Sequence, residues 1–239
     1  RSTPVKTQAK KKRLKCRFFF ILKYYSIIIP VFNEAHLLDD LIKELKIYIY
    51  EGHEVIIVDD GSDDGSFDML SKNTDIRFYN FIDNRGKGEA VKKGLLNAKN
   101  EKIIIFDGDF ELHPKDIRKL MILDENIKCT FAKRKNINTL DSIWNIGNRI
   151  ISKFFNLIYQ SNLDDALCCA KSFFKSDIDI KNLKSKKFDI DIEIASVLIK
   201  KYSTANNIAI DYKRRSMDDG KKLKIFDSFS IIKRIIEKA

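Results

Sequence analysis

The chain has 239 residues, which is enough for one α/β domain with a full core and short for two domains. A hydrophobic fraction of 44% and a charged fraction of 33% exclude an intrinsically disordered chain. The net charge is +11, but residues 1–17 hold eight basic side chains and no acid, so subtracting eight from eleven leaves the body at +3. A continuous nucleic-acid-binding face is therefore not expected.

The basic tail of residues 1–24 has three interpretations: contact with an anionic lipid surface, contact with nucleic acid, or simple solvation. The cysteines show no zinc-binding spacing, which favours reduced thiols in a cytosolic compartment. They are Cys16, Cys129, Cys168 and Cys169. No stretch reaches the roughly 18 apolar residues of a transmembrane helix, so we expect a chain without a membrane span.

The first half of the chain predicts alternating strands and helices. Buried strands are expected at 26–31, 54–58, 76–79, 102–106 and 127–132. Asn33 is expected to cap the first helix, and Pro114 suits the first turn of a later one. Such alternation predicts a mostly parallel sheet with helices on both faces, whose ligands bind at the carboxyl ends of the strands. After about residue 135 the pattern becomes helical and amphipathic.

Acidic and glycine-rich loops follow the predicted strands. Asp107-Gly-Asp109 can hold one hard divalent cation through two carboxylates, although such a pair is often only a solvated turn. Asp59 and Asp60 suit hydrogen bonds to a ribose or base, or alternatively a turn and helix start. The loop 84–88 can cradle phosphate through backbone N–H groups and Lys87, or it is a tight turn.

The order and spacing of these loops resemble family 2 inverting glycosyltransferases. The motifs are Pro30-Val-Phe-Asn-Glu34, Val58-Asp-Asp-Gly-Ser-Asp-Asp-Gly-Ser66, Asn84-Arg-Gly-Lys-Gly88 and Phe106-Asp-Gly-Asp109. The resemblance covers roughly residues 25–225 and implies one GT-A domain there, with a C-terminal amphipathic helix at 226–239. It also implies an enzyme that uses a nucleotide-sugar donor and Mg²⁺ or Mn²⁺.

The later part is similar to the polyprenol-phosphate sugar synthases of that family. The similar stretches are Asp165-Ala-Leu-Cys-Cys-Ala-Lys171, Phe188-Asp-Ile-Asp-Ile-Glu193 and Tyr212-Lys-Arg-Arg215 with Lys221-Lys222-Leu223. Cys168-Cys169 and Gly220 depart from the pattern of this group. The resemblance implies transfer of a hexose from GDP-mannose or UDP-glucose to a polyprenyl phosphate at the cytoplasmic face of a membrane.

The resemblance also implies the site residues. Asp107 and Asp109 would bind the metal, and Asp109, Asp191, Arg215 and Lys222 would be catalytic. The donor would be bound by Pro30, Phe32, Glu34, Val58, Asp59, Asp60, Lys87, Asp107, Gly108 and Arg134. Asp191 would be a general base only if the acceptor is a sugar hydroxyl, because a lipid phosphate is already ionised.

Three alternatives stay open from sequence: a hydroxyl of a glycan or lipid-linked saccharide as acceptor, a nucleotidyltransferase, and a non-catalytic nucleotide-sugar-binding protein. Two apolar stripes suit either peripheral membrane contact or core packing. They comprise Ile143, Trp144, Ile146, Ile150, Ile151, Phe154, Phe155 and Ile158, and then Ile225, Phe226, Phe229, Ile232, Ile235 and Ile236. A membrane-anchoring subunit is a further partner that the sequence leaves open.

Overall fold

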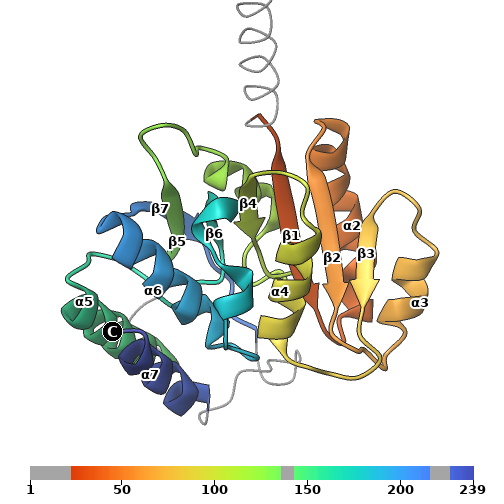
Figure 1. The fold of residues 1–239 in the computed structure, drawn as a ribbon. Coiled ribbons are helices and arrows are strands. Elements are labelled where there is room, and N and C mark those ends of the chain that lie inside the picture. The colour runs from red at the N-terminus through yellow and green to blue at the C-terminus, as the bar shows by residue number, and fades with distance from the viewer. Residues whose placement is uncertain (1–22, 136–142, 216–226) are drawn as a thin grey trace, which may run out of the picture.

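The structure is a computed structural model that describes residues 23–135, 143–215 and 227–239. In these residues seven strands form one sheet in the order β3-β2-β1-β4-β6-β5-β7 (Figure 1). The strands are β1 (Tyr25–Val31), β2 (Glu54–Asp59), β3 (Arg77–Asn80), β4 (Lys102–Ile105), β5 (Cys129–Lys135), β6 (Lys171–Phe174) and β7 (Asn206–Asp211).

Helices cover both faces of the sheet, because alternate residues of the central strands are apolar on each side. The α-helices are α2 (Ala35–Tyr50), α3 (Ser66–Ser71), α4 (Lys87–Asn97), α5 (Ile143–Tyr159), α6 (Ile190–Tyr202) and α7 (Asp227–Glu237). Short 3₁₀ helices are η1 (Pro114–Leu120), η2 (Lys175–Asp177) and η3 (Ile180–Asn182). One apolar cluster lies between the sheet and α2, and a second lies between the sheet and α4, α6 and α7.

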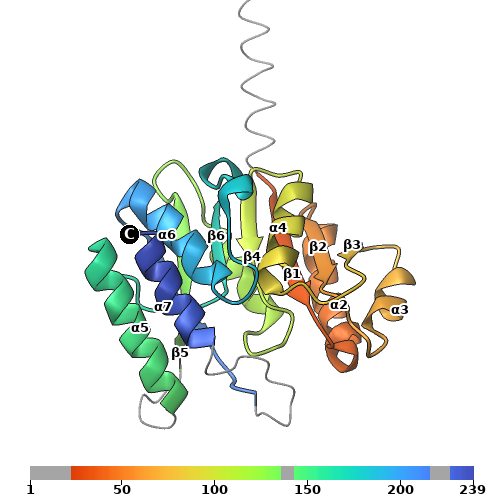
Figure 2. The same cartoon turned by 60° about the horizontal axis from the view of Figure 1, so that its bottom comes forward.

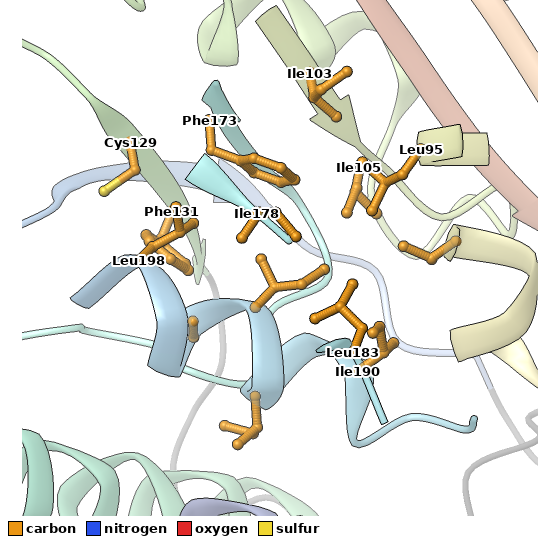
Figure 3. Close-up of a cluster of buried hydrophobic side chains, with 14 of the residues drawn as sticks. Leu95, Ile103, Ile105, Cys129, Phe131, Phe173, Ile178, Leu183, Ile190 and Leu198 are labelled. Carbon is orange, nitrogen blue, oxygen red and sulfur yellow. The ribbon is translucent and has the colours of Figure 1, made fainter. Parts of the chain in front are cut away.

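The second cluster joins the two halves of the chain. Figure 3 shows Leu95 of α4 beside Ile105 of β4, and Phe173 of β6 near Ile178. Phe131 of β5 and Leu198 of α6 are both fully buried in the same cluster. The late strands and helices are therefore part of one core with the early ones.

The sheet is mostly parallel, as the sequence predicts. β1 pairs in parallel with β2 and β4, β2 with β3, and β5 with β7. β6 is antiparallel to both of its neighbours, β4 and β5. The chain crosses from one side of β1 to the other between β3 and β4, which makes the carboxyl ends of β1 and β4 the switch point where ligands bind in such sheets.

Several local predictions need correction. The residue that precedes α2 is Glu34 and not the predicted Asn33, and the Glu34 side chain makes no capping hydrogen bond. Asn33 has a φ of 51° and its amide donates to Asp63 instead. Pro114 does begin a helix, but it is 3₁₀ and is capped by His113. The strands β6 and β7 lie where only helical structure was expected.

The two amphipathic stripes divide between core and surface. Their buried members are Ile151 and Phe155 of α5 and Ile235 of α7. Ile231 of α7, which the predicted stripe does not include, is buried as well. Their exposed members are Ile146, Ile150 and Ile158 of α5 and Phe229, Ile232 and Ile236 of α7. Each stripe therefore packs on the core with one edge and leaves another edge at the surface. Ile225, Phe226 and the basic tail of residues 1–17 lie outside the described residues, as do the side chains of Ile143 and Trp144.

Helix α7 is attached to α5 and α6 (Figures 1 and 2). Arg234 donates to the Asp189 carboxylate from two nitrogens, both at 3.0 Å. Lys238 Nζ lies 2.9 Å from the buried Glu193 carboxylate. Two ion pairs thus attach α7 to the start of α6. In the part of the chain described here, no helix is long and apolar enough to cross a membrane.

Candidate active site

The candidate site lies at the carboxyl ends of β1, β2 and β4, where acidic side chains follow the strands. β2 ends at Asp59, and Asp60 follows it. β4 is followed by Asp107 and Asp109. Figure 2 brings this edge of the sheet forward, with the start of α4 and the loop before α6 beside it.

Asp60 holds the glycine-rich loop in place. Its carboxylate accepts hydrogen bonds from the backbone N–H groups of Arg85, at 2.9 Å, and Gly86, at 2.8 Å. Asp59 similarly accepts from the backbone and hydroxyl of Ser62. Burial raises the pKa of both Asp59 and Asp60. Both carboxylates therefore organise loops at the strand ends, whatever contacts they make with a nucleotide.

The turn at 86–88 fits closely against the loop before α6. Gly86 has a φ of 96°, and a Cβ there would lie 2.4 Å from the Lys186 carbonyl oxygen. A Cβ on Gly88 would lie 2.6 Å from the Ser185 carbonyl oxygen, and the Gly88 N–H donates to Lys186 at 2.8 Å. Only glycine permits this approach. It brings the first turn of α4 next to the first turn of α6, although 104 residues separate Lys87 from Asp191.

Four charges of alternating sign meet at this junction, the buried Lys171 and Asp191 and the half-buried Lys87 and Asp107, and we refer to them as the charge network. Lys87 Nζ lies 2.8 Å from Asp107 Oδ2 and 2.9 Å from Asp191 Oδ2. Lys171 Nζ donates to the other Asp191 oxygen, Oδ1. Burial alone would raise the pKa of Asp191, but Lys171 and Lys87 outweigh it and the pKa is lowered. Asp191 is therefore ionised, and each of its two carboxylate oxygens accepts a hydrogen bond from a lysine.

A second group surrounds Asp109. Its carboxylate accepts the Glu111 N–H at 3.0 Å, and burial together with Asp107 and Glu111 raises its pKa to about 7. Arg215 donates from Nη1 to Glu34 at 2.9 Å and from its backbone N–H to Glu111 at 3.1 Å. The end of the β7 segment is thereby attached to the loops after β1 and β4.

Asp107 and Asp109 fit a divalent cation. Asp107 Oδ1 is buried and has no hydrogen-bond partner among the described residues. Burial and the nearby carboxylates of Asp107 and Glu111 raise the pKa of Asp109, so a cation there would offset unfavourable negative charge. The described part of the chain has no cluster of three or more side chains that would enclose a metal. Two carboxylates suit Mg²⁺ or Mn²⁺ completed by phosphate oxygens.

The raised pKa of Asp109 predicts a pH-dependent gain in stability for Asp109→Asn. An acid whose pKa rises from about 4 in the unfolded chain to about 7 in the fold costs stability as pH rises between these values. In EDTA at pH 8, the variant should therefore melt at least ~3 °C above the wild type, the shift that about 1 kcal/mol gives in a chain of this size. The difference should vanish near pH 4.

Thermal unfolding at pH 4 and pH 8 measures this effect. Asp124→Asn is the control, because Asp124 is an exposed acid whose pKa is lowered by the N–H groups of Ile127 and Asn126. A melting temperature of Asp109→Asn below that of the wild type at pH 8 would contradict a raised pKa of Asp109 in the folded chain.

The other predicted donor-binding residues lie as follows. Pro30 and Phe32 are half-buried at the end of β1, and Glu34 pairs with Arg215. The Val58 side chain is fully buried in the apolar core, so it is not available to contact a nucleotide. A Cβ on Gly108 would lie within 3.0 Å of Leu41 and Ile29, so glycine lets this loop rest on the sheet.

The structure pairs Arg134 with a carboxylate. Its guanidinium donates twice to Asp165, at 2.6 and 2.9 Å, and lies over the Tyr212 ring. In the predicted contact of Arg134 with a diphosphate, the guanidinium would therefore already be paired with the Asp165 carboxylate. Lys222 lies outside the described residues, and its catalytic role stays a prediction.

Sequence patterns assigned no role to Lys171 and Glu111. Lys171 stands on β6 and is fully buried, and Glu111 joins Arg215 to the Asp109 loop. A signal for Lys171 is present in hindsight: a lysine opens the otherwise apolar run Lys171-Ser-Phe-Phe174. No comparable signal marks Glu111, whose partner is 104 residues away.

Solved structures support the GT-A fold. Glucosyl-3-phosphoglycerate synthase from Mycobacterium tuberculosis in complex with UDP superposes with a TM-score of 0.70 at 13% identity, over 90% of this chain and 80% of that one. Mannosyl-3-phosphoglycerate synthase from Rubrobacter xylanophilus gives 0.69 at 14% identity, over 94% and 75%. The mycobacterial enzyme has also been crystallised with Mn²⁺ and UDP. At these identities the likeness is evidence for the fold alone.

Curated relatives are more similar in sequence. The undecaprenyl-phosphate 4-deoxy-4-formamido-L-arabinose transferase of Pseudomonas syringae is 27% identical over 212 residues, 84% of this chain and 61% of that protein. The dolichyl-phosphate beta-glucosyltransferase of Dictyostelium discoideum is 26% identical over 232 residues, 86% of this chain and 70% of that protein. The chain thus spans less than two thirds of the first of these relatives.

A family model settles the class of the chain. The model for glycosyl transferase family 2 matches residues 26–179, more than half of the chain and all of the segment that holds Asp59, Asp60, Asp107 and Asp109. The match sets aside the nucleotidyltransferase reading and confirms the resemblance found in the sequence. This chain belongs to glycosyl transferase family 2.

Proposed function

We propose that the chain transfers a hexose, with inversion, from a nucleotide sugar such as GDP-mannose or UDP-glucose to a polyprenyl phosphate. The observation that carries this proposal is the state of Asp191, whose two oxygens are held by Lys171 and Lys87. A carboxylate held in this way, with its pKa lowered, is a poor base for a sugar hydroxyl. A lipid phosphate is ionised at neutral pH and needs no base.

The curated relatives support the same acceptor. The Pseudomonas relative is named an undecaprenyl-phosphate transferase and the Dictyostelium relative a dolichyl-phosphate transferase. Both names describe a sugar acceptor that is a polyprenyl phosphate. A phosphate acceptor and a nucleoside diphosphate leaving group together bring several negative charges to one site, and Lys87 and Arg215 are positioned to meet them.

In the proposed reaction, a phosphate oxygen of the acceptor forms a bond to the anomeric carbon. The bond from that carbon to the nucleoside diphosphate breaks, and the electron pair leaves on the diphosphate. Asp107 and Asp109 would hold Mg²⁺ or Mn²⁺, which as a Lewis acid stabilises charge on the diphosphate. Lys87 places its ammonium beside Asp107, and the Arg215 guanidinium, paired with Glu34, interacts electrostatically with Asp109.

The test is sugar transfer by the purified full chain to a short polyprenyl phosphate. UDP-glucose, GDP-mannose and UDP-N-acetylglucosamine are offered in turn, with Mg²⁺, with Mn²⁺ and with EDTA. Metal-dependent lipid product from one donor is the expected result. Donor hydrolysis without lipid product would overturn the phosphate acceptor and favour a hydroxyl acceptor. Neither hydrolysis nor donor binding would overturn the proposal as a whole.

Asp191→Asn separates the two acceptors. With a phosphate acceptor, the variant should keep measurable transfer, because no proton has to be removed, although Lys171 and Lys87 lose the charge of the carboxylate that both contact. With a hydroxyl acceptor, loss of the base should abolish transfer while donor binding remains. The readouts are lipid product and donor affinity, measured on the same preparation.

Peripheral membrane contact is the second part of the proposal. Ile150 and Phe229 are 61% and 69% exposed on the adjacent helices α5 and α7, and Lys153 and Lys233 are exposed on the same helices. Apolar side chains with flanking cations suit the surface of an anionic bilayer. We expect the chain to co-sediment with vesicles that contain phosphatidylglycerol, and less with vesicles of phosphatidylcholine alone.

A double variant, Ile150→Glu with Phe229→Glu, should reduce this co-sedimentation by about 10-fold, because charges in an interface are unfavourable. Tyr50→Glu is the matched control, since Tyr50 is 79% exposed at the end of α2. Equal binding of the wild type and the double variant would contradict a role for these helices at the membrane.

A further inference from the structure

Lys171 is a fully buried cation without a place in the proposed reaction. It begins β6, where its backbone lies between Ile105 of β4 and Phe131 of β5. Its side chain is 0% exposed, and its ammonium donates to Asp191 Oδ1. A buried ammonium costs several kcal/mol of desolvation unless a close partner compensates it. Packing alone therefore does not account for an ammonium group at this position in the middle of the sheet.

The position of Asp191 depends on both lysines. One oxygen faces Lys171 from the sheet, and the other faces Lys87 from α4. Lys87 in turn bridges to Asp107, whose second oxygen is buried and unpaired among the described residues. The four charges sum to zero, so removing any one of them changes the charge that a ligand of Asp107 experiences.

We propose that Lys171 is a positioning residue, which neutralises one oxygen of Asp191 so that the other holds Lys87 beside the metal-binding carboxylate Asp107. This inference rests on the proposed function for the metal at Asp107 and Asp109. Without Lys171, Asp191 is balanced by Lys87 alone, and Lys87 is drawn away from Asp107. The metal site then becomes more negative, while the cation that meets the diphosphate is misplaced.

The proposal predicts opposite effects on metal binding and on transfer. In Lys171→Met, Mn²⁺ should bind tighter, on the order of 5-fold, because one positive charge near the site is lost. Sugar transfer should nevertheless fall at least about 10-fold. Asp191→Asn should weaken Mn²⁺ binding, because a negative charge is lost. The double variant Lys171→Met with Asp191→Asn restores neutrality and should bind Mn²⁺ within about 2-fold of the wild type.

The experiment measures free Mn²⁺ by electron paramagnetic resonance in titrations of the full chain and these three variants, with near-UV circular dichroism as the check on folding. Lys175→Met is the matched control, because Lys175 follows β6 but donates to the Ala98 carbonyl oxygen away from the site. If Lys171→Met alone does not fold, the double variant should still bind Mn²⁺ tighter than Asp191→Asn.

Weaker or unchanged Mn²⁺ binding in folded Lys171→Met, or a double variant no tighter than Asp191→Asn, would overturn the inference, since a purely structural lysine predicts these results. A wild type that binds no Mn²⁺ would instead overturn the metal site of the proposed function, and the positioning role with it. The two failures are therefore distinguished by the wild-type titration.

Discussion

Asp109→Asn should reduce sugar transfer by about 1,000-fold, although it leaves the fold intact. The carboxylate is one of the two that we propose hold the divalent cation, and a metal at a departing diphosphate supplies several kcal/mol of stabilisation. Asparagine keeps the size of the side chain and its hydrogen bond to the Glu111 N–H, but it removes the charge. The measurement is kcat/KM for transfer at saturating Mn²⁺.

This prediction combines with the expected gain in stability of the same variant in EDTA at pH 8. Loss of activity together with higher stability is typical of a buried charge kept for function. Addition of Mn²⁺ should raise the melting temperature of the wild type and not that of Asp109→Asn. Asp124→Asn should retain full transfer. Wild-type activity in Asp109→Asn would mean that the metal site lies elsewhere.

Lys87→Met should have the second largest effect, and here stability and activity should fall together. Asp107 and Asp191 both lose the cation that lies within 2.9 Å of each. Removing one partner of a buried pair costs about 3–5 kcal/mol, so the melting temperature should drop by roughly 10 °C. Transfer at saturating metal should fall about 100-fold, because Lys87 also faces the proposed diphosphate position.

Lys92→Met tests whether this effect belongs to the site. Lys92 lies on the same helix, one turn further along, and pairs at 2.7 Å with Glu89 outside the charge network. The Lys92→Met variant should lose less than ~1 kcal/mol of its free energy of unfolding and should keep its transfer activity. Equal losses in both variants would show that α4, and not the charge of Lys87, is what the substitution disturbs.

The first half of the fold could be predicted because its signals are local. Continuous apolar runs mark β1, β2 and β4, and the acids that end them lie together because the carboxyl ends of parallel strands meet at one edge. Asp107, Lys87 and Asp191 were each predicted individually as site residues. That Lys87 stands between the two carboxylates was not predicted, since Gly86 and Gly88 bring 185–187 close only in the folded chain.

The second half was missed for equally physical reasons. β6 has four residues, including a lysine and a serine, and β7 begins with two asparagines, so neither has the apolar run of a central strand. The buried position of Lys171 depends on Asp191, which comes from a helix twenty residues later. The predicted helix cap at Asn33 failed for the same reason, a partner that is distant in the sequence: the Asn33 side chain donates to Asp63, thirty residues away.

The order of the strands has a consequence for how the chain is made. β6 lies between β4 and β5, so the pairing edge of β4 has no partner until Phe174 has left the ribosome. The early strands β1 to β4 can assemble first, but they then present an unpaired edge formed by the apolar β4. During synthesis this edge is exposed for roughly seventy residues, and slow or truncated synthesis there should favour aggregation. The strand that carries Lys171 therefore completes the sheet as well as the charge network.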